Sequence, residues 1–110
     1  MACRNFSRAA EARSLIIEKT DNPNIHIKLV DLSSFESVRA FARSVNESEE
    51  RLDILVNNAA VAPQSEEKTR DGYHLGMQVN YFSMFLLTNL LLGKSAGYFF
   101  SSQCHISLQE

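Results

Sequence analysis

The chain has 110 residues, of which 45% are hydrophobic and 22% charged, so it has room for one domain or part of one and the composition of a globular protein. Its formal net charge is −2, and its 11 Lys and Arg residues are scattered along the sequence, which argues against nucleic-acid binding. Cys3 and Cys104 lie near opposite ends and the histidines are isolated from one another, so neither a metal site nor a disulfide framework is predicted. An intracellular, cytoplasmic setting is the expectation.

The first part of the chain predicts a helix followed by a strand. Residues 6–20 are rich in Ala, Arg, Glu and Leu, follow Asn5, which suits an N-cap, and stop before a turn that contains Pro23. Residues 25–31 alternate Ile and Leu with His and Lys, the period of two that is typical of a strand near a sheet edge.

A second helix and a second strand are predicted next. Ser33 and Glu36 have the spacing at which a hydroxyl and a carboxylate satisfy free backbone donors at a helix start. Apolar residues then recur at steps of three and four along one face: Phe35, Val38, Phe41, Ala42 and Val45. Residues 52–57, "LDILVN", are almost continuously apolar, which predicts a central parallel strand covered on both faces.

The last predicted helix runs from a cap at Asp71 to about Leu92, and it is apolar nearly all round, so we expect it to be buried. Its most apolar part, residues 79–93, is interrupted by polar side chains and is shorter than the roughly 20 residues that a membrane span needs, so no membrane segment is predicted. Residues 97–102 have the β-propensity of a short strand. The alternation of helices and strands predicts an α/β fold with a parallel sheet.

Polar side chains follow two of the predicted strands. Asn57 and Asn58 come at the end of one strand and are followed by the small Ala59 and Ala60, while Asp31 ends the other. Ligands bind at the carboxyl ends of parallel strands, so these residues outline one edge of a pocket for a flat ligand such as a nucleotide. The alternative is that Asn and Asp stand there because their side chains bond nearby backbone.

The motifs "ACRN", "DLSS", "RLDILVNNAA", "KTRDG" and "FLLTNLLL" follow one another from Ala2 to Leu92. In this order and spacing they resemble the classical short-chain dehydrogenase/reductases, and within them the NADP-preferring retinol dehydrogenase group. The resemblance implies a partial Rossmann-like, doubly wound parallel sheet with flanking helices, and some members of that family are membrane-associated. An unrelated flavodoxin-like binding domain is a weaker alternative, because it needs an intact first strand.

The resemblance also implies roles for particular residues. Arg4 would pair with the 2′-phosphate of NADP, because a guanidinium offers a planar fork of donors to phosphate oxygens. Asp31 and Leu32 would border the adenine, and Asn57 would fix the central strand and line the cofactor cleft through Ala59 and Ala60. Asn80 would be the catalytic-site asparagine that kinks its helix and holds a water in the proton relay.

The chain departs from the family pattern in several places. Ala60 stands where the family has Gly, so its Cβ is expected to crowd a backbone turn or the ribose. The four glycines form no G-x-G-x-x-G, and no tyrosine is followed by Lys four residues later, so the pyrophosphate-binding turn and the Tyr-x-x-x-Lys pair are not found. Ser101 and Ser102 follow a predicted strand, as a catalytic serine would, but their neighbours do not match the family.

These departures are typical of a fragment. Residues 1–93 are expected to be the central part of a dinucleotide-binding domain without its first strand, and residues 94–110 a divergent tail. Binding of NADP is expected to be weak or absent, and the chain by itself should not catalyse oxidoreduction of retinoid or lipid alcohols and carbonyls. The competing hypothesis is a non-catalytic interaction module that pairs with a full-length relative or with itself.

The absent strand has consequences for folding. It would lie between the strand stub at residues 1–4 and the strand at residues 52–57, so the sheet would lose its middle. Either residues 25–31 then pair directly with residues 52–57, or the chain stays loosely packed. Apolar side chains are expected to be left exposed on several elements: Phe35, Phe41, Phe82, Phe85 and Leu86.

Overall fold

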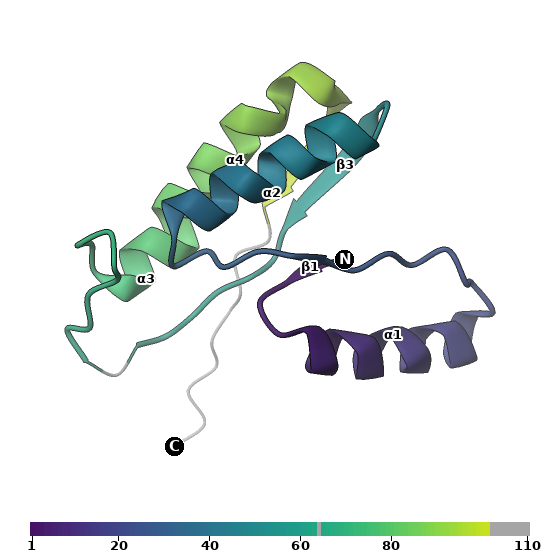
Figure 1. Cartoon of the computed structure of the whole chain (residues 1–110), viewed down its shortest axis with the longest axis horizontal. Helices are drawn as coiled ribbons and strands as arrows, with labels where there is room; N and C mark the ends of the chain where they lie inside the picture. The colour runs from purple at the N-terminus through teal and green to yellow at the C-terminus, as the bar shows by residue number, and fades with distance from the viewer. Residues whose placement is uncertain (64, 102–110) are drawn as a thin grey trace. The chain divides into compact units, whose positions relative to one another are not determined.

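The computed structural model describes residues 1–63 and 65–101, which divide into two compact units, Met1–Asp31 and a second unit that begins at Leu32 (Figure 1). The first unit contains strand β1 (Ala2–Cys3), helix α1 (Phe6–Thr20) and strand β2 (Lys28–Leu29). The second contains α2 (Phe35–Ser48), β3 (Leu52–Asn57), a long helix in three segments, and β4 (Ser95–Ser101). The predicted α/β fold is confirmed.

Helix α1 has the limits that its sequence predicts. The side chain of Asn5 accepts a hydrogen bond of 3.0 Å from the backbone N–H of Arg8, which caps the first turn. The helix ends at Asp21, whose φ of 53° is in the left-handed region that terminates helices.

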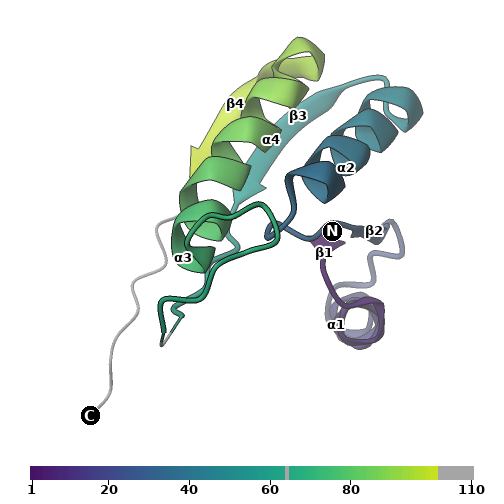
Figure 2. The same ribbon diagram turned by 60° about the vertical axis from the view of Figure 1, so that its left-hand side comes forward.

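The strand predicted over residues 25–31 is wrong in length, because only Lys28 and Leu29 form β2. They pair in parallel with Ala2 and Cys3 (Figure 2), and a partner of two residues supports a ladder no longer than itself. The backbone of Ile25 is used elsewhere, since its N–H donates to Pro23 O and its carbonyl accepts from Arg13 Nε.

In the second unit β3 pairs in parallel with β4, with Leu52 opposite Ser95 and Asn57 opposite Ser101. The predicted strand over residues 97–102 is thus confirmed as far as residue 101, and residue 102 lies outside the described residues. Of the two alternatives for residues 25–31, direct pairing with residues 52–57 is wrong, because β2 pairs with β1 and β3 with β4.

The two predicted helix caps of this unit are both wrong. Helix α2 begins one residue later than the Ser33 cap requires, and the Ser34 hydroxyl accepts from the N–H of Ser37 instead. Asp71 does not cap the last helix, which begins at Leu75. Its carboxylate accepts from the N–H of Phe35 at 2.8 Å, so it caps α2, which lies earlier in the sequence.

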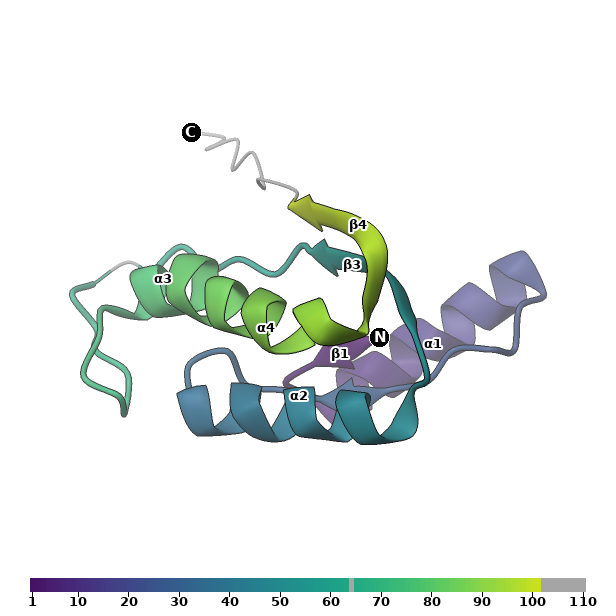
Figure 3. The same cartoon turned by 90° about the horizontal axis from the view of Figure 1, so that it is seen from above.

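The long helix runs as α3 (Leu75–Met77), a π-helical turn (Gln78–Phe82) and α4 (Ser83–Leu91), followed by a 3₁₀ turn (Leu92–Lys94). Within this unit α2 and α4 lie on the same side of the β3–β4 pair (Figures 2 and 3). The core between these elements is formed by six buried apolar residues: Val38, Ala42, Val45, Val79, Leu87 and Leu91.

Two burial predictions are wrong. Strand β3 is not covered on both faces, since Ile54 and Val56 are more than half exposed, at 56% and 58%. The last helix is not buried all round either, because Tyr81 and Phe85 are exposed on the side away from the core. Both elements have an apolar face that no described residue of their unit covers.

The last helix, predicted to run to about Leu92, extends from Leu75 to Lys94. Its 20 residues have a mean hydropathy of 1.3, so by length and composition it could cross a membrane, although the apolar run over residues 79–93 is shorter than a span needs. One helix of this kind is weak support for a span, because the core helix of a globular domain has the same length and composition. Its buried stripe of Val79, Leu87 and Leu91 is typical of a core helix.

Candidate functional site

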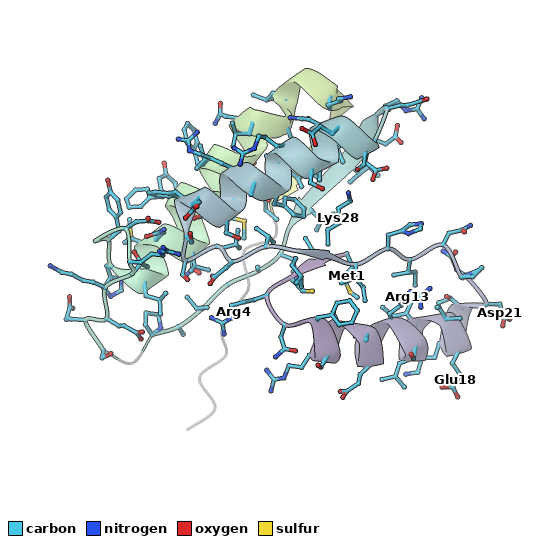
Figure 4. The ribbon with its side chains drawn as sticks, in the orientation of Figure 1. Met1, Arg4, Arg13, Glu18, Asp21 and Lys28 are labelled. Carbon is cyan, nitrogen blue, oxygen red and sulfur yellow. The ribbon has the colours of Figure 1, made fainter. Side chains whose placement is uncertain are left out.

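Arg4 and Asp31 lie at the same edge of the β1–β2 pair. Arg4 directly follows β1 and is exposed (Figure 4), and Asp31 comes two residues after β2 and is half-buried. The strands are parallel with Cys3 opposite Leu29, and Val30 N–H donates to Cys3 O at 2.9 Å, so both side chains belong to the carboxyl ends of the strands. This is the edge at which ligands of open parallel sheets bind.

The surroundings of Arg4 suit an anion. Arg4 immediately precedes Asn5, the N-cap of the 15-residue helix α1, whose N-terminus has a partial positive charge. A guanidinium beside a helix N-terminus is a combination that favours phosphate. The structure therefore places Arg4 and Asp31 at one edge of the β1–β2 pair, and their roles toward the phosphate and the adenine stay predictions.

In the second unit, the segment that follows β3 is held at both of its ends by the long helix. Asn57, at the last position of β3, donates through Nδ2 to the hydroxyl of Thr88 at 3.1 Å. Val61 is held by Asn80: its N–H donates to Asn80 Oδ1 and its carbonyl accepts from Asn80 Nδ2, each at 2.8 Å. Residues 58–60, which lie between these anchors, are exposed.

Asn80 lies inside the π-helical turn, so the helix is irregular at the residue for which a kink is predicted. Turns of this type are often found at functional sites. Both polar atoms of the Asn80 side chain are engaged with the backbone of Val61, which makes the side chain a clamp rather than a donor to a reacting group. The predicted water and proton-relay role of Asn80 stays a prediction.

A cavity of about 220 Å³ lies where these residues meet. It is lined by Asn57, Asn80, Tyr81, Met84, Phe85 and Thr88. Its volume is below the roughly 300–1,000 Å³ of ordinary ligand pockets, so it would hold only part of a dinucleotide. Its polar lining consists of amide and hydroxyl groups, with no carboxylate, imidazole or amine, so these residues can orient a ligand but do not form an acid–base pair.

Ala60 causes no backbone strain. Among the described residues other than glycine only Asp21 has a positive φ, so the backbone at Ala60 takes a conformation that any residue adopts. The expectation that its Cβ crowds the turn is wrong, whereas crowding of a ribose stays a prediction. Ala59 and Ala60 are both exposed, and their short side chains leave the backbone open to close approach.

The sequence did not single out every residue that shapes this site. Thr88 holds Asn57, and two further polar residues of the same helix, Gln78 and Ser83, are wholly buried. These residues could have been found from the sequence because they are polar side chains that interrupt an apolar helix. A buried polar group needs a hydrogen-bond partner, so such a position indicates a specific contact. Groups of His, Cys, Asp or Glu that would hold a metal ion are not found among the described residues.

The sequence model of the short chain dehydrogenase family matches residues 1–97. The chain belongs to this family. Mouse retinol dehydrogenase 13 is 47% identical over 94 residues, which cover 86% of this chain and 28% of that protein. Mouse retinol dehydrogenase 14 is 40% identical over 104 residues, covering 84% of this chain and 31% of that protein. The chain thus spans less than a third of the length of these short chain dehydrogenase relatives.

Solved structures match the fold of this chain. A protein from Mycobacterium paratuberculosis, 29% identical, superposes with a TM-score of 0.71 over 86% of this chain and 32% of its own. Carbonyl reductase from chicken fatty liver, bound to NADPH, is 27% identical and superposes with a TM-score of 0.61 over 84% of this chain and 38% of its own. A parallel sheet with helices that covers part of a Rossmann fold is therefore shown, and NADP use is supported for the family.

Proposed function

We propose that the chain is the central part of an NADP-dependent short chain oxidoreductase that acts on retinoid or lipid alcohols and carbonyls, and that it is inactive by itself. The observation that carries the proposal is the pairing of Asn80 with both backbone groups of Val61, beside Asn57 at the end of β3. The names of the relatives support the substrate class, since two of them are retinol dehydrogenases at 47% and 40% identity.

In this proposal the chain's residues hold the cofactor in place. When bound, NADPH supplies a hydride to a carbonyl carbon. Arg4 binds the 2′-phosphate and Asp31 accepts a hydrogen bond from the adenine amino group, with Leu32 beside it. Asn57, Ala59 and Ala60 form the wall along the ribose, and Asn80 fixes the end of that wall through Val61.

The proposed lack of activity rests on proton transfer. No tyrosine in the chain has a Lys four residues later, since Tyr73, Tyr81 and Tyr98 are followed at that distance by Met77, Phe85 and Ser102. General acid catalysis typically contributes about 10²- to 10⁴-fold to a rate. We therefore expect the pure chain, mixed with NADPH and retinal, to oxidise no NADPH. Cofactor-dependent turnover by chain free of any related enzyme would contradict this.

An interaction module is the second candidate, and the exposed side of the long helix favours it. Tyr81 and Phe85 are 61% and 65% exposed, and Met77 lies one turn before them at 49%. Side chains at steps of four form one apolar stripe, which is typical of a helix that packs against a partner. Substituting Tyr81 and Phe85 by Ser should abolish co-purification with a complete short chain dehydrogenase, whereas an interaction that survives would exclude this stripe as the contact.

Residues 1–93 are the part proposed to belong to the dinucleotide-binding domain, and residues 94–110 the part proposed to diverge. For location we propose the reducing interior of the cell. The support is the cysteine pattern: Cys3 is free in the structure, and the second cysteine lies far away in the sequence.

A further inference from the structure

Two residues of the π-helical turn and Ser83, the first residue of α4, place polar side chains against three different segments of the second unit. Gln78 donates through Nε2 to Asp71 Oδ2 at 2.6 Å, in the loop before the helix. Asn80 clamps Val61 after β3, and Ser83 donates through its hydroxyl to the carbonyl of Leu32 at 2.6 Å. One turn of helix thus anchors the segment after β3 and the segment that leads into α2.

The π-turn itself explains why two of these side chains act together. The N–H of Ser83 donates to the carbonyl of Gln78, a bond that spans five residues instead of the four of an α-helix. Residues five apart are therefore one turn apart here, which brings Gln78 and Ser83 to the same face. Both are completely buried, with 0% of each residue exposed, so their hydrogen bonds are shielded from water.

These two side chains hold both ends of residues 32–35. Ser83 holds the Leu32 carbonyl, and because a peptide group is planar, this fixes the direction of the whole peptide between residues 32 and 33. Gln78 holds the other end indirectly, since the Asp71 oxygen that it contacts also accepts from Phe35 N–H at 2.8 Å. The Thr69 hydroxyl bonds Gln78 Oε1 and completes the network.

We propose that Ser83 and Gln78 are positioning residues for an adenine nucleotide, which they orient by fixing the Leu32 peptide and the turn into α2. The inference rests on the proposed function, in which Leu32 borders the adenine. It adds that the same helical turn sets both the adenine edge, through Ser83, and the wall that ends at Val61, through Asn80. The ligand class is a nucleotide with an adenine base and a phosphate on its ribose.

The test uses the full chain, labelled with ¹⁵N, and adenosine 2′,5′-bisphosphate as the probe, with affinity measured from amide shifts. Ser83→Ala is expected to weaken binding about 2- to 13-fold, the range that corresponds to a hydrogen bond of typical strength. Ser14→Ala is the matched control, because the Ser14 hydroxyl bonds Ala10 O within its own exposed helix. It should leave affinity unchanged.

Inorganic phosphate is the second probe, and its proposed contact is Arg4 in the first unit, so Ser83→Ala should leave phosphate affinity unchanged while it weakens the bisphosphate. The amide shifts of Val45 and Leu91, in the core of the second unit, separate positioning from general loss of structure: Ser83→Ala should leave them unchanged, and their loss would overturn the inference. Equal loss for both probes, equal effects of Ser83→Ala and Ser14→Ala, or no effect of Ser83→Ala would each overturn the inference. Failure of the proposed function is distinguishable, because the unmutated chain would then bind no bisphosphate, and the inference would fall with it.

Discussion

At the residue scale, the Asn80 side chain holds the segment that follows β3. Its amide bonds both backbone groups of Val61 at 2.8 Å, so it fixes the chain where the predicted cofactor wall ends. The family motif identified this residue from the sequence. Its partner was not predictable, because Val61 lies 19 residues away and only the fold brings the two together.

Replacing Asn80 by Ala should release Val61. Each hydrogen bond of this kind contributes about 0.5–1.5 kcal/mol, so the Val61 amide should exchange with solvent deuterium roughly 2- to 13-fold faster. Amide exchange followed by NMR measures this. Asn89→Ala is the control, since its amide bonds Phe85 O within the same helix at 2.8 Å and should not affect Val61. Unchanged exchange at Val61 would mean that the clamp does not form in solution.

The carboxylate of Asp71 makes the stability of the second unit depend on pH. The N–H of Phe35 and then the Gln78 amide donate to its carboxylate, and this lowers the pKa of Asp71 below its ordinary value of 3.8. A carboxyl group whose pKa is lowered on folding contributes stability that is complete above its unfolded pKa and is lost as the pH falls through the folded pKa. The contribution should therefore be present above about pH 5 and disappear at pH values below 3.8.

The measurement is the protection of the Phe35 amide between pH 5 and pH 2.5, compared with Asp71→Asn. In the unmutated chain protection should fall with pH, whereas the Asn variant should be less protected at pH 5 and change little. Asp53→Asn removes a carboxylate whose bond is an exposed ion pair with Arg51, and it should behave like the unmutated chain. Identical pH profiles for the unmutated chain and Asp71→Asn would refute the cap.

At the element scale, the sequence predicted most helices and strands from periodicity and motifs. Helix α1 and strand β3 follow their predicted limits because their signals are local: a cap at Asn5 and an apolar run from Leu52. The predictions that failed depended on distant partners. The length of β2 is set by β1, and Asp71 caps a helix 36 residues earlier, neither of which a local pattern encodes.

Two adjacent leucines at the end of the long helix should contribute differently to stability, because only one of them is buried. Leu91 is 1% exposed in the core, and Leu92 is 49% exposed. Leu91→Ala should lower the free energy of unfolding by about 2–5 kcal/mol, because it leaves a cavity in the core. Leu92→Ala, at an exposed position, should change the free energy of unfolding by no more than about 0.5 kcal/mol. Helix content measured by circular dichroism should fall for Leu91→Ala only. Equal losses for the two variants would contradict the packing of α4 on α2.

At the scale of the whole molecule, the chain has a small core and uncovered apolar faces. Phe85 is exposed, as expected from the sequence. Phe35, Phe41, Phe82 and Leu86 are half-buried instead, and the exposure expected for them is wrong. Phe35 and Phe82 each pack edge-on against Tyr73, at 5.6 and 5.4 Å between ring centres. No local pattern predicts this cluster, because Phe35 lies far from Tyr73 in the sequence and only the fold brings the rings together.

A chain of this size buries a modest share of its surface, so we expect marginal stability. Heating should give a broad transition, and a dye that detects apolar surface should bind at 25 °C, because Ile54, Val56 and Phe85 are exposed. Calorimetry and dye fluorescence measure both properties. A sharp two-state transition from a monomer that binds no dye would show that the two units suffice for a stable protein, and would favour an independent binding function.

The central claim is that the chain carries the adenosine-phosphate edge of an NADP site, and a comparison of NADPH with NADH tests it most directly. Affinities are measured by NMR titration for the unmutated chain, for Arg4→Ala, and for Arg8→Ala, a control that removes another exposed arginine of the first unit. We predict weak binding that prefers NADPH, with the preference lost in Arg4→Ala and kept in Arg8→Ala. Equal affinity for the two cofactors, or a preference that survives Arg4→Ala, would contradict the claim.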